Sequence, residues 1–177
     1  MIRSILFYLI FGQFLIHFSC ASHPPLKTVQ YVEISKYLGR WFEITSIPVL
    51  PQKGCRCTTA TYGLKENGDL SVYNRCTKEN DKVSDINGYA VVKDDSTNAK
   101  LDVVFFWPFR GDYQILKLEE DYSIVLVGNE SRKYFWILAR NPKIPEEKKQ
   151  EYLKEAELQN FPIKEIQTTD HSNCKYE

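Results

Sequence analysis

The sequence contains eight short runs of strand-forming residues that follow one another with no helical segment between them. They are rich in Val, Ile, Tyr, Phe and Thr, and turn signals separate them, such as Asn67-Gly68 between the second run and the third. The runs are 39–47, 57–64, 69–76, 86–92, 99–107, 112–119, 122–129 and 133–140. Even spacing of this kind is typical of an up-and-down antiparallel barrel. We therefore predict an all-β fold based on an eight-stranded barrel.

Two further elements are predicted after the last of these runs. Residues 145–161 read as one C-terminal α-helix, with Pro145 at the first helical position and acidic residues in the first turn. Its packing stripe is Tyr152, Leu153 and Ala156. Residues 163–170 read as a short final strand that ends near Cys174.

The N-terminus has the pattern of an export signal rather than of a folded element. Arg3 is followed by an apolar run from Ile5 to Phe18 and then by small residues. The run is shorter than the roughly 20 apolar residues that a membrane span needs, although an uncleaved anchor is the alternative. We predict a signal peptide over 1–19, an extended tether over 20–31 that contains Pro24 and Pro25, and a barrel domain over 32–177.

Cys20 has two interpretations. Bacterial lipoprotein signals end in a small residue followed by a Cys that becomes lipidated, and Ser19-Cys20 fits that pattern. His17 departs from it, because a Leu is usual three positions before the Cys. Lipidation of Cys20 is the favoured interpretation, and ordinary signal cleavage after Cys20 or Ala21 is the alternative.

The other four cysteines are Cys55, Cys57, Cys76 and Cys174. An even number in an exported chain predicts two disulfides, for which three pairings exist. A zinc site is the rival interpretation, but a Cys-x-Cys spacing without a nearby His fits tetrahedral coordination poorly.

Charge and motif content favour binding over catalysis. Lys plus Arg and Asp plus Glu both number 23, so no global field attracts nucleic acid. After the signal only His23 and His171 remain, and neither belongs to a recognisable nucleophile motif or a phosphate-binding loop. We expect no enzyme activity, no cofactor and no metal.

Three motifs in order then resemble the lipocalin family. These are Gly39-Arg40-Trp41 at the start of the first run, Asp121-Tyr122 before the seventh, and Arg140 in "WILARNP". The resemblance implies that Trp41, preceded by Gly39, closes the floor of the barrel and that Arg140 stacks on its indole.

The same resemblance extends to the cysteines and to the ligand. Bacterial members of the family imply a Cys55–Cys76 pair, and a secreted member implies a Cys57–Cys174 pair. Bacterial members also imply a lipidated Cys20 in the outer membrane, since Ala21 rather than Asp follows it; the secreted member implies an extracellular protein. The implied ligand is a fatty acid, a lysophospholipid or another small hydrophobic molecule, carried for transport or membrane maintenance.

Six residues are candidates for lining such a cavity. Trp136 and Leu138 share strand parity with Arg140 and are therefore the better candidates. The whole set is Tyr89, Phe105, Trp107, Tyr113, Trp136 and Leu138. A filled core without a cavity is the alternative interpretation of these side chains.

A different class of function remains open for "FFWPFRG", residues 105–111. An exposed aromatic loop could dock on a partner, on a second copy of the chain to form a homodimer, or on a membrane. This hypothesis requires that Trp107 and Phe109 be accessible to solvent.

Overall fold

The computed structural model describes residues 23–47 and 49–176. The predicted signal peptide over 1–19 and Cys20 lie outside the described residues. Among the described residues, no helix has the length and apolar character that crossing a bilayer requires.

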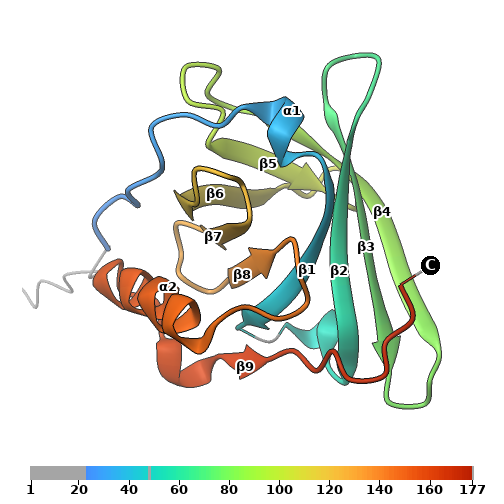
Figure 1. The fold of residues 1–177 in the computed structure, drawn as a ribbon. Coiled ribbons are helices and arrows are strands. Elements are labelled where there is room, and N and C mark those ends of the chain that lie inside the picture. Colours follow the sequence, from blue (N-terminus) through green and yellow to red (C-terminus); the bar gives the residue numbers. More distant parts are fainter. Residues whose placement is uncertain (1–22, 48, 177) are drawn as a thin grey trace, which may run out of the picture.

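The predicted eight-stranded barrel is confirmed (Figure 1). Each strand pairs antiparallel with the next, and β8 pairs with β1 to close the ring. The strands are β1 (Gly39–Ser46), β2 (Cys55–Leu64), β3 (Leu70–Lys78), β4 (Val83–Val92), β5 (Lys100–Val104), β6 (Gly111–Leu118), β7 (Ile124–Gly128) and β8 (Phe135–Ala139). Three short helices accompany them: α1 (Ile34–Tyr37), η1 (Leu50–Gln52) and η2 (Ile163–Glu165).

The C-terminal helix and the final strand are also present, as α2 (Glu146–Leu158) and β9 (Gln167–Thr168). Tyr152, Leu153 and Ala156 are the buried residues of α2, as predicted. Pro145 is the residue that precedes the helix rather than its first helical position.

The barrel wall separates two apolar cores, because both faces of several strands are buried. In β7, Val125 and Val127 belong to the core inside the barrel, whereas Ile124 and Leu126 belong to the core between the barrel and α2. All five residues of β7 are consequently buried. This double burial explains why runs such as "IVLV" carry apolar residues at consecutive positions rather than at alternate ones.

The two ends of the barrel differ. At one end, here called the floor, α1 leads into β1, and the loops 65–69, 93–99 and 119–123 join the strands. At the other end, here called the mouth, the strands are joined by loops 47–54, 79–82, 105–110 and 129–134. Consecutive antiparallel strands turn back at opposite ends, so the connecting loops alternate between the mouth and the floor along the chain.

The segment predicted as a tether lies along the outside of the barrel over its described part. The Arg132 guanidinium in the mouth loop 129–134 donates to the Pro24 carbonyl. Further along, the Lys27 backbone exchanges two hydrogen bonds with the Gln159 side-chain amide, at 2.9 and 3.2 Å. The Val32 amide then donates to the Thr97 carbonyl in a floor loop. The segment therefore runs from the mouth to the floor.

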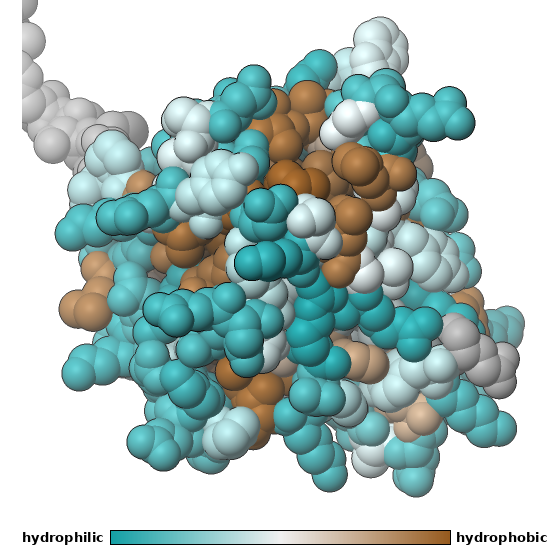
Figure 2. Space-filling view, turned by 45° about the horizontal axis from the view of Figure 1, so that its top comes forward, coloured by the Kyte–Doolittle hydropathy of each residue, from teal (hydrophilic) through white to brown (hydrophobic). Residues whose placement is uncertain are grey.

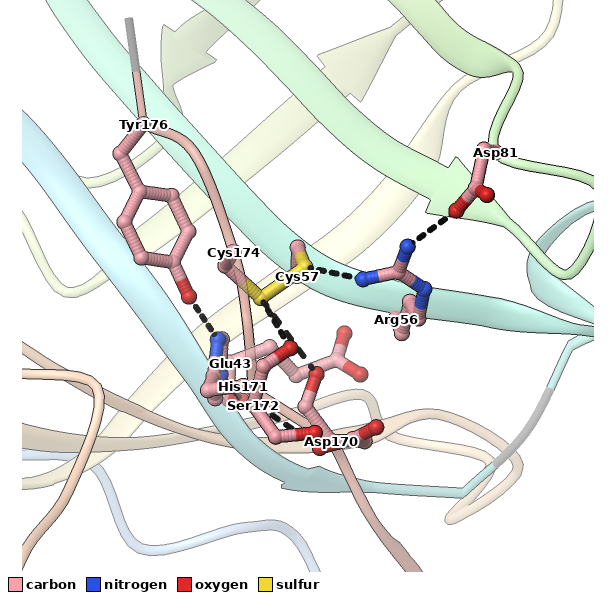
Figure 3. Close-up of a disulfide and its surroundings, with 9 residues drawn as sticks. All are labelled: Glu43, Arg56, Cys57, Asp81, Asp170, His171, Ser172, Cys174 and Tyr176. Carbon is pink, nitrogen blue, oxygen red and sulfur yellow. Dashed lines mark hydrogen bonds and ion pairs between the residues drawn. A yellow bond between two sulfur atoms is a disulfide. The ribbon is translucent and has the colours of Figure 1, made fainter.

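The C-terminal tail completes the wall where β1 and β2 diverge. β1 pairs with β2 only from Gly39 to Phe42, and a bulge follows in β2 near Cys57. β9 takes over as the partner of β1 at Thr45 and Ser46. The structure contains the disulfide Cys57–Cys174, which holds the tail there (Figure 3), and also the disulfide Cys55–Cys76.

Candidate functional site

Trp41 and Arg140 form the floor of the barrel. Trp41 is fully buried, and its indole N–H donates to the Tyr37 carbonyl at 2.8 Å. The central carbon of the Arg140 guanidinium lies 3.8 Å from the centre of the indole, as the resemblance implied. Gly39 has a φ of +91°, and a Cβ there would lie 3.4 Å from the Arg140 guanidinium. Glycine thus lets the chain enter β1 close beside the arginine.

The inner wall above this floor is predominantly apolar. The alternation of the strands directs Leu70 and Val72 of β3 inward, opposite Ala90 and Gly88 of β4. The ring of Phe105 lies over Gly88, where an added Cβ would come within 2.7 Å of it. Burying an alkyl chain against such a wall is favourable by about 0.8 kcal/mol per methylene.

A cluster of three tyrosines supplies polar groups within this apolar interior. Tyr37, Tyr62 and Tyr113, here called the tyrosine cluster, come from α1, β2 and β6, and all are at least nine-tenths buried. The Tyr113 hydroxyl lies 2.6 Å from that of Tyr37 and 2.9 Å from that of Tyr62. Burial raises the pKa of Tyr62 to about 12 and raises the pKa of Tyr37 and of Tyr113 well above the usual value. All three hydroxyls are therefore neutral at physiological pH.

Four of the six predicted lining residues face the barrel interior. Tyr113 and Leu138 are buried in the inner core, and Phe105 and Trp136 pack against it while staying partly exposed toward the mouth.

Tyr89 and Trp107 lie elsewhere. Ala90 and Val92 of β4 belong to the inner core, so the alternation turns Tyr89 outward, where the Lys65 ammonium lies 5.0 Å from its ring. Trp107 belongs to the mouth loop 105–110 and is 80% exposed. The sequence prediction misplaced Trp107 because it continued the fifth run, 99–107, past the end of β5, and it misplaced Tyr89 because it assigned no inward parity to β4.

Two inward residues were missed altogether, Tyr37 and Tyr62. Tyr62 could have been found, because it shares parity with Ala60 on the predicted strand. Tyr37 could not, because it lies on the one-turn helix α1, which is too short to show a periodic pattern.

Glu43 is a buried acid where the tail meets β1 (Figure 3). Its carboxylate accepts hydrogen bonds from Thr169 at 2.7 Å, from Ser46 at 3.0 Å and from Gln52 at 3.2 Å. Burial raises the pKa of this carboxyl above its usual range, although the three donors oppose the change. The His171 ring bonds to the Glu43 carbonyl at 2.7 Å, so this acid links the tail to the mouth half of β1.

The floor end also carries a shallow outer pocket, separate from the interior. Its apolar lining includes Ile34, Leu38, Leu64 and Val92. Figure 2, whose view brings the α1 end forward, shows apolar side chains reaching the surface among hydrophilic ones. Within residues 23–47 and 49–176, no group of His, Cys, Asp and Glu side chains could hold a metal ion.

Comparison with known proteins points to one family. The family model described as a lipocalin-like domain matches residues 32–171. The chain is 34% identical over 152 residues to outer membrane lipoprotein Blc of Citrobacter freundii, covering 84% of this chain and 86% of that protein. It is 35% identical over 166 residues to apolipoprotein D of Bos taurus, covering 89% and 86%.

A solved structure shows the same fold at lower identity. Insecticyanin from the tobacco hornworm Manduca sexta superposes with a TM-score of 0.69 at 20% identity, covering 88% of this chain and 90% of that one.

Glu43 makes the stability of the protein depend on pH in a specific direction. The ionised carboxylate is penalised by burial above its raised pKa, and this penalty disappears as the pH falls toward the ordinary value of about 4.3. We expect Glu43→Gln to stabilise the protein relative to wild type more at pH 8 than at pH 5, as measured by urea unfolding at both pH values.

The control is Glu66→Gln, which removes one acidic charge from an exposed floor loop. Burial lowers the pKa of the neighbouring His171, but that group is common to wild type and variant, so its titration cancels. A stability difference for Glu43→Gln that grows on acidification would contradict the assignment.

Proposed function

The chain belongs to the lipocalin family, and we propose that its barrel binds and carries a fatty acid, a lysophospholipid or another small hydrophobic molecule. The observation that carries the proposal is the composition of the inner wall. It is apolar from the floor upward, and its mouth-side aromatics, Phe105 and Trp136, face inward while remaining partly exposed. An acyl chain would occupy the apolar part, and a polar headgroup would stay at the mouth. The proposal is one of binding, without catalysis, a cofactor or a metal.

Phe105 and Phe106 provide a matched pair for testing carriage. Phe105 belongs to the inner wall, whereas the next residue, Phe106, is 70% exposed in the mouth loop. We expect Phe105→Ala to weaken palmitate and lysophosphatidylcholine binding by about tenfold or more, since it removes several buried contacts. Phe106→Ala should leave the affinity unchanged. Isothermal titration calorimetry on the purified protein measures both.

Binding of neither lipid to wild type would contradict the carrier function. Equal losses in the two variants would place the lipid at the mouth rather than in the barrel.

We further propose that lipidated Cys20 anchors the protein in the outer membrane, as the name of the Blc relative states for that protein. Support comes from the path of the described chain, since Pro24 is held at the mouth by Arg132. Pro24 lies four positions after Cys20 in the sequence, and four steps along the chain span at most about 14 Å. An acyl group on Cys20 would therefore hold the mouth near the bilayer. The alternative is a secreted carrier that resembles apolipoprotein D.

Native mass spectrometry of the protein purified from its own host in gentle detergent tests the anchor. We expect a diacyl or triacyl mass, palmitate included, on an N-terminal Cys20, and a retained lipid in the same spectrum. An unmodified N-terminus after Cys20 or Ala21 would overturn the anchor and favour the secreted alternative.

A second function, docking of the mouth on a lipid bilayer, is favoured by the exposure of its aromatic loop. Phe106, Trp107 and Phe109 are 70%, 80% and 76% exposed. The exposure of Trp107 and Phe109 is what the hypothesis of an interaction role for this loop requires. Aromatic side chains at an exposed rim are typical of surfaces that enter the interfacial region of a membrane.

The charges of the two ends support the same orientation. The mouth loops carry five basic and three acidic side chains, whereas the floor loops carry two basic and seven acidic ones. An anionic bilayer therefore attracts the mouth and repels the floor. This charge difference and the position of Pro24 together favour a bilayer, rather than a second copy of the chain, as the surface on which the mouth docks.

Cosedimentation with vesicles of phosphatidylethanolamine and phosphatidylglycerol tests docking on the unacylated mature protein. We expect Phe106→Ser/Trp107→Ser/Phe109→Ser to abolish cosedimentation and to leave palmitate affinity unchanged. Leu64→Ser, which removes an exposed apolar side chain beside the floor loop 65–69, should bind vesicles like wild type. A wild-type dimer in light scattering that the triple variant loses would assign the loop to a homodimer instead.

A further inference from the structure

The tyrosine cluster has more donor protons than its own hydrogen bonds can use. Three hydroxyl groups carry three protons, but the cluster contains only two hydroxyl-to-hydroxyl contacts. No other hydrogen bond involves these hydroxyls in the described part of the chain. However the protons are arranged, one hydroxyl proton has no protein acceptor.

Such a donor in a buried position is unfavourable unless something accepts it. Buried polar groups in native proteins are nearly always paired, and a buried donor without an acceptor loses the hydrogen bonds it makes in water. The most exposed member, Tyr113, is only 9% accessible. A molecule inside the barrel is therefore the natural source of the missing acceptor.

A second polar group faces the same interior. Asn74 follows Val72 with the same parity on β3 and pairs with Ala60, which packs in the inner core. The side-chain carbonyl oxygen of Asn74 is buried and has no hydrogen-bond partner among the described residues. The interior thus offers two unsatisfied polar positions in an otherwise apolar wall.

The surroundings of the cluster exclude an anionic partner. The inward positions on the strands that carry Tyr62 and Tyr113, and on the neighbouring strands, are Trp41, Glu43, Ala60, Leu70, Val72, Asn74, Leu101, Val103, Ile115, Val125 and Val127. The one charged side chain among them is the Glu43 carboxylate, which repels an anion. The Arg140 guanidinium lies over the Trp41 indole and donates to three backbone carbonyls, those of Lys36, Arg40 and Tyr122. A carboxylate or phosphate beside the cluster would be buried without a counter-ion, which is strongly unfavourable.

We propose that the tyrosine cluster is a recognition site for an uncharged oxygen, so that the barrel selects a lipid whose inner end carries a ketone, ester, alcohol or protonated acid group. This inference rests on the proposed carrier function and specifies which lipids the carrier prefers. A plain acyl chain, which brings only a methyl group to this position, leaves the spare proton unpaired. A lipid with an oxygen there satisfies it.

The test compares two neutral ligands of equal length, 2-dodecanone and 1-dodecene, by displacement of the fluorescent probe N-phenyl-1-naphthylamine from the mature protein. We expect the ketone to bind several-fold to about tenfold more tightly, which corresponds to one net hydrogen bond. The infrared carbonyl stretch of bound 2-dodecanone should move to lower frequency than in an alkane solvent. That shift reports the hydrogen bond directly.

The variant Tyr37→Phe/Tyr62→Phe/Tyr113→Phe removes all three hydroxyls, and with them the spare proton, and keeps the aromatic rings. We expect it to bind ketone and alkene equally, to lose the infrared shift, and to retain its affinity for the probe and for dodecanoate, whose charge stays at the mouth. Tyr73→Phe is the matched control, because Tyr73 lies on the outer face of β3 between Val72 and Asn74 and should keep the ketone preference.

The outcomes separate the two proposals. If neither 2-dodecanone nor 1-dodecene displaces the probe, the carrier function itself fails. If both bind wild type equally and the carbonyl stretch matches that in alkane, the carrier stands and the recognition site is overturned. A loss of dodecanoate affinity equal to the loss of ketone affinity in the triple variant would show that the tyrosines act by packing alone, and this also overturns the site.

Discussion

The contact between Arg140 and Trp41 is the interaction on which the rest of the architecture depends. One guanidinium covers the indole and donates to carbonyls of α1, of β1 and of the loop between β6 and β7. It therefore joins segments separated by up to 104 residues. A desolvated cation–π contact contributes up to about 2 kcal/mol, and the hydrogen bonds add to it. With this end closed, any entry into the barrel interior is through the mouth.

The closed sheet also explains the distribution of apolar residues. An open sheet of this size would have one wet face, but the ring of β1–β8 encloses an inner core and supports α2 on a second, outer one. The inner core holds the proposed ligand site, and the outer core contributes stability without facing it. Residues of one strand, such as Val125 and Leu126, thereby serve different purposes at adjacent positions.

Much of this organisation was predictable from the sequence because it is local. Turn signals and strand-forming residues identified all eight strands, and the helical spacing of Tyr152 and Ala156 identified the buried face of α2. The three motifs around Trp41, Tyr122 and Arg140 identified the family. Trp136 and Leu138 were identified as the better lining candidates for the same reason, since strand parity extends to them from Arg140; Tyr113 and Phe105 also face inward, but no parity argument supported them.

What could not be predicted depends on register between distant segments. Tyr37 and Tyr113 meet across 76 residues, and no local pattern shows that their hydroxyls share one site. The replacement of β2 by β9 beside Thr45 follows from a bulge near Cys57, and bulges have weak sequence signals. Tyr89 was misplaced because β4 lacked an anchor for its parity.

The tail strand has a consequence for the order in which the chain reaches its folded state. Thr45 and Gln167 are 122 residues apart, so the mouth half of β1 has an unpaired edge until the last residues of the protein have been synthesised. The Cys57–Cys174 disulfide, which fastens that tail, forms only in an oxidising compartment. The rim beside β1 is thus the last part of the wall to be completed, and the disulfide that secures it depends on oxidising conditions.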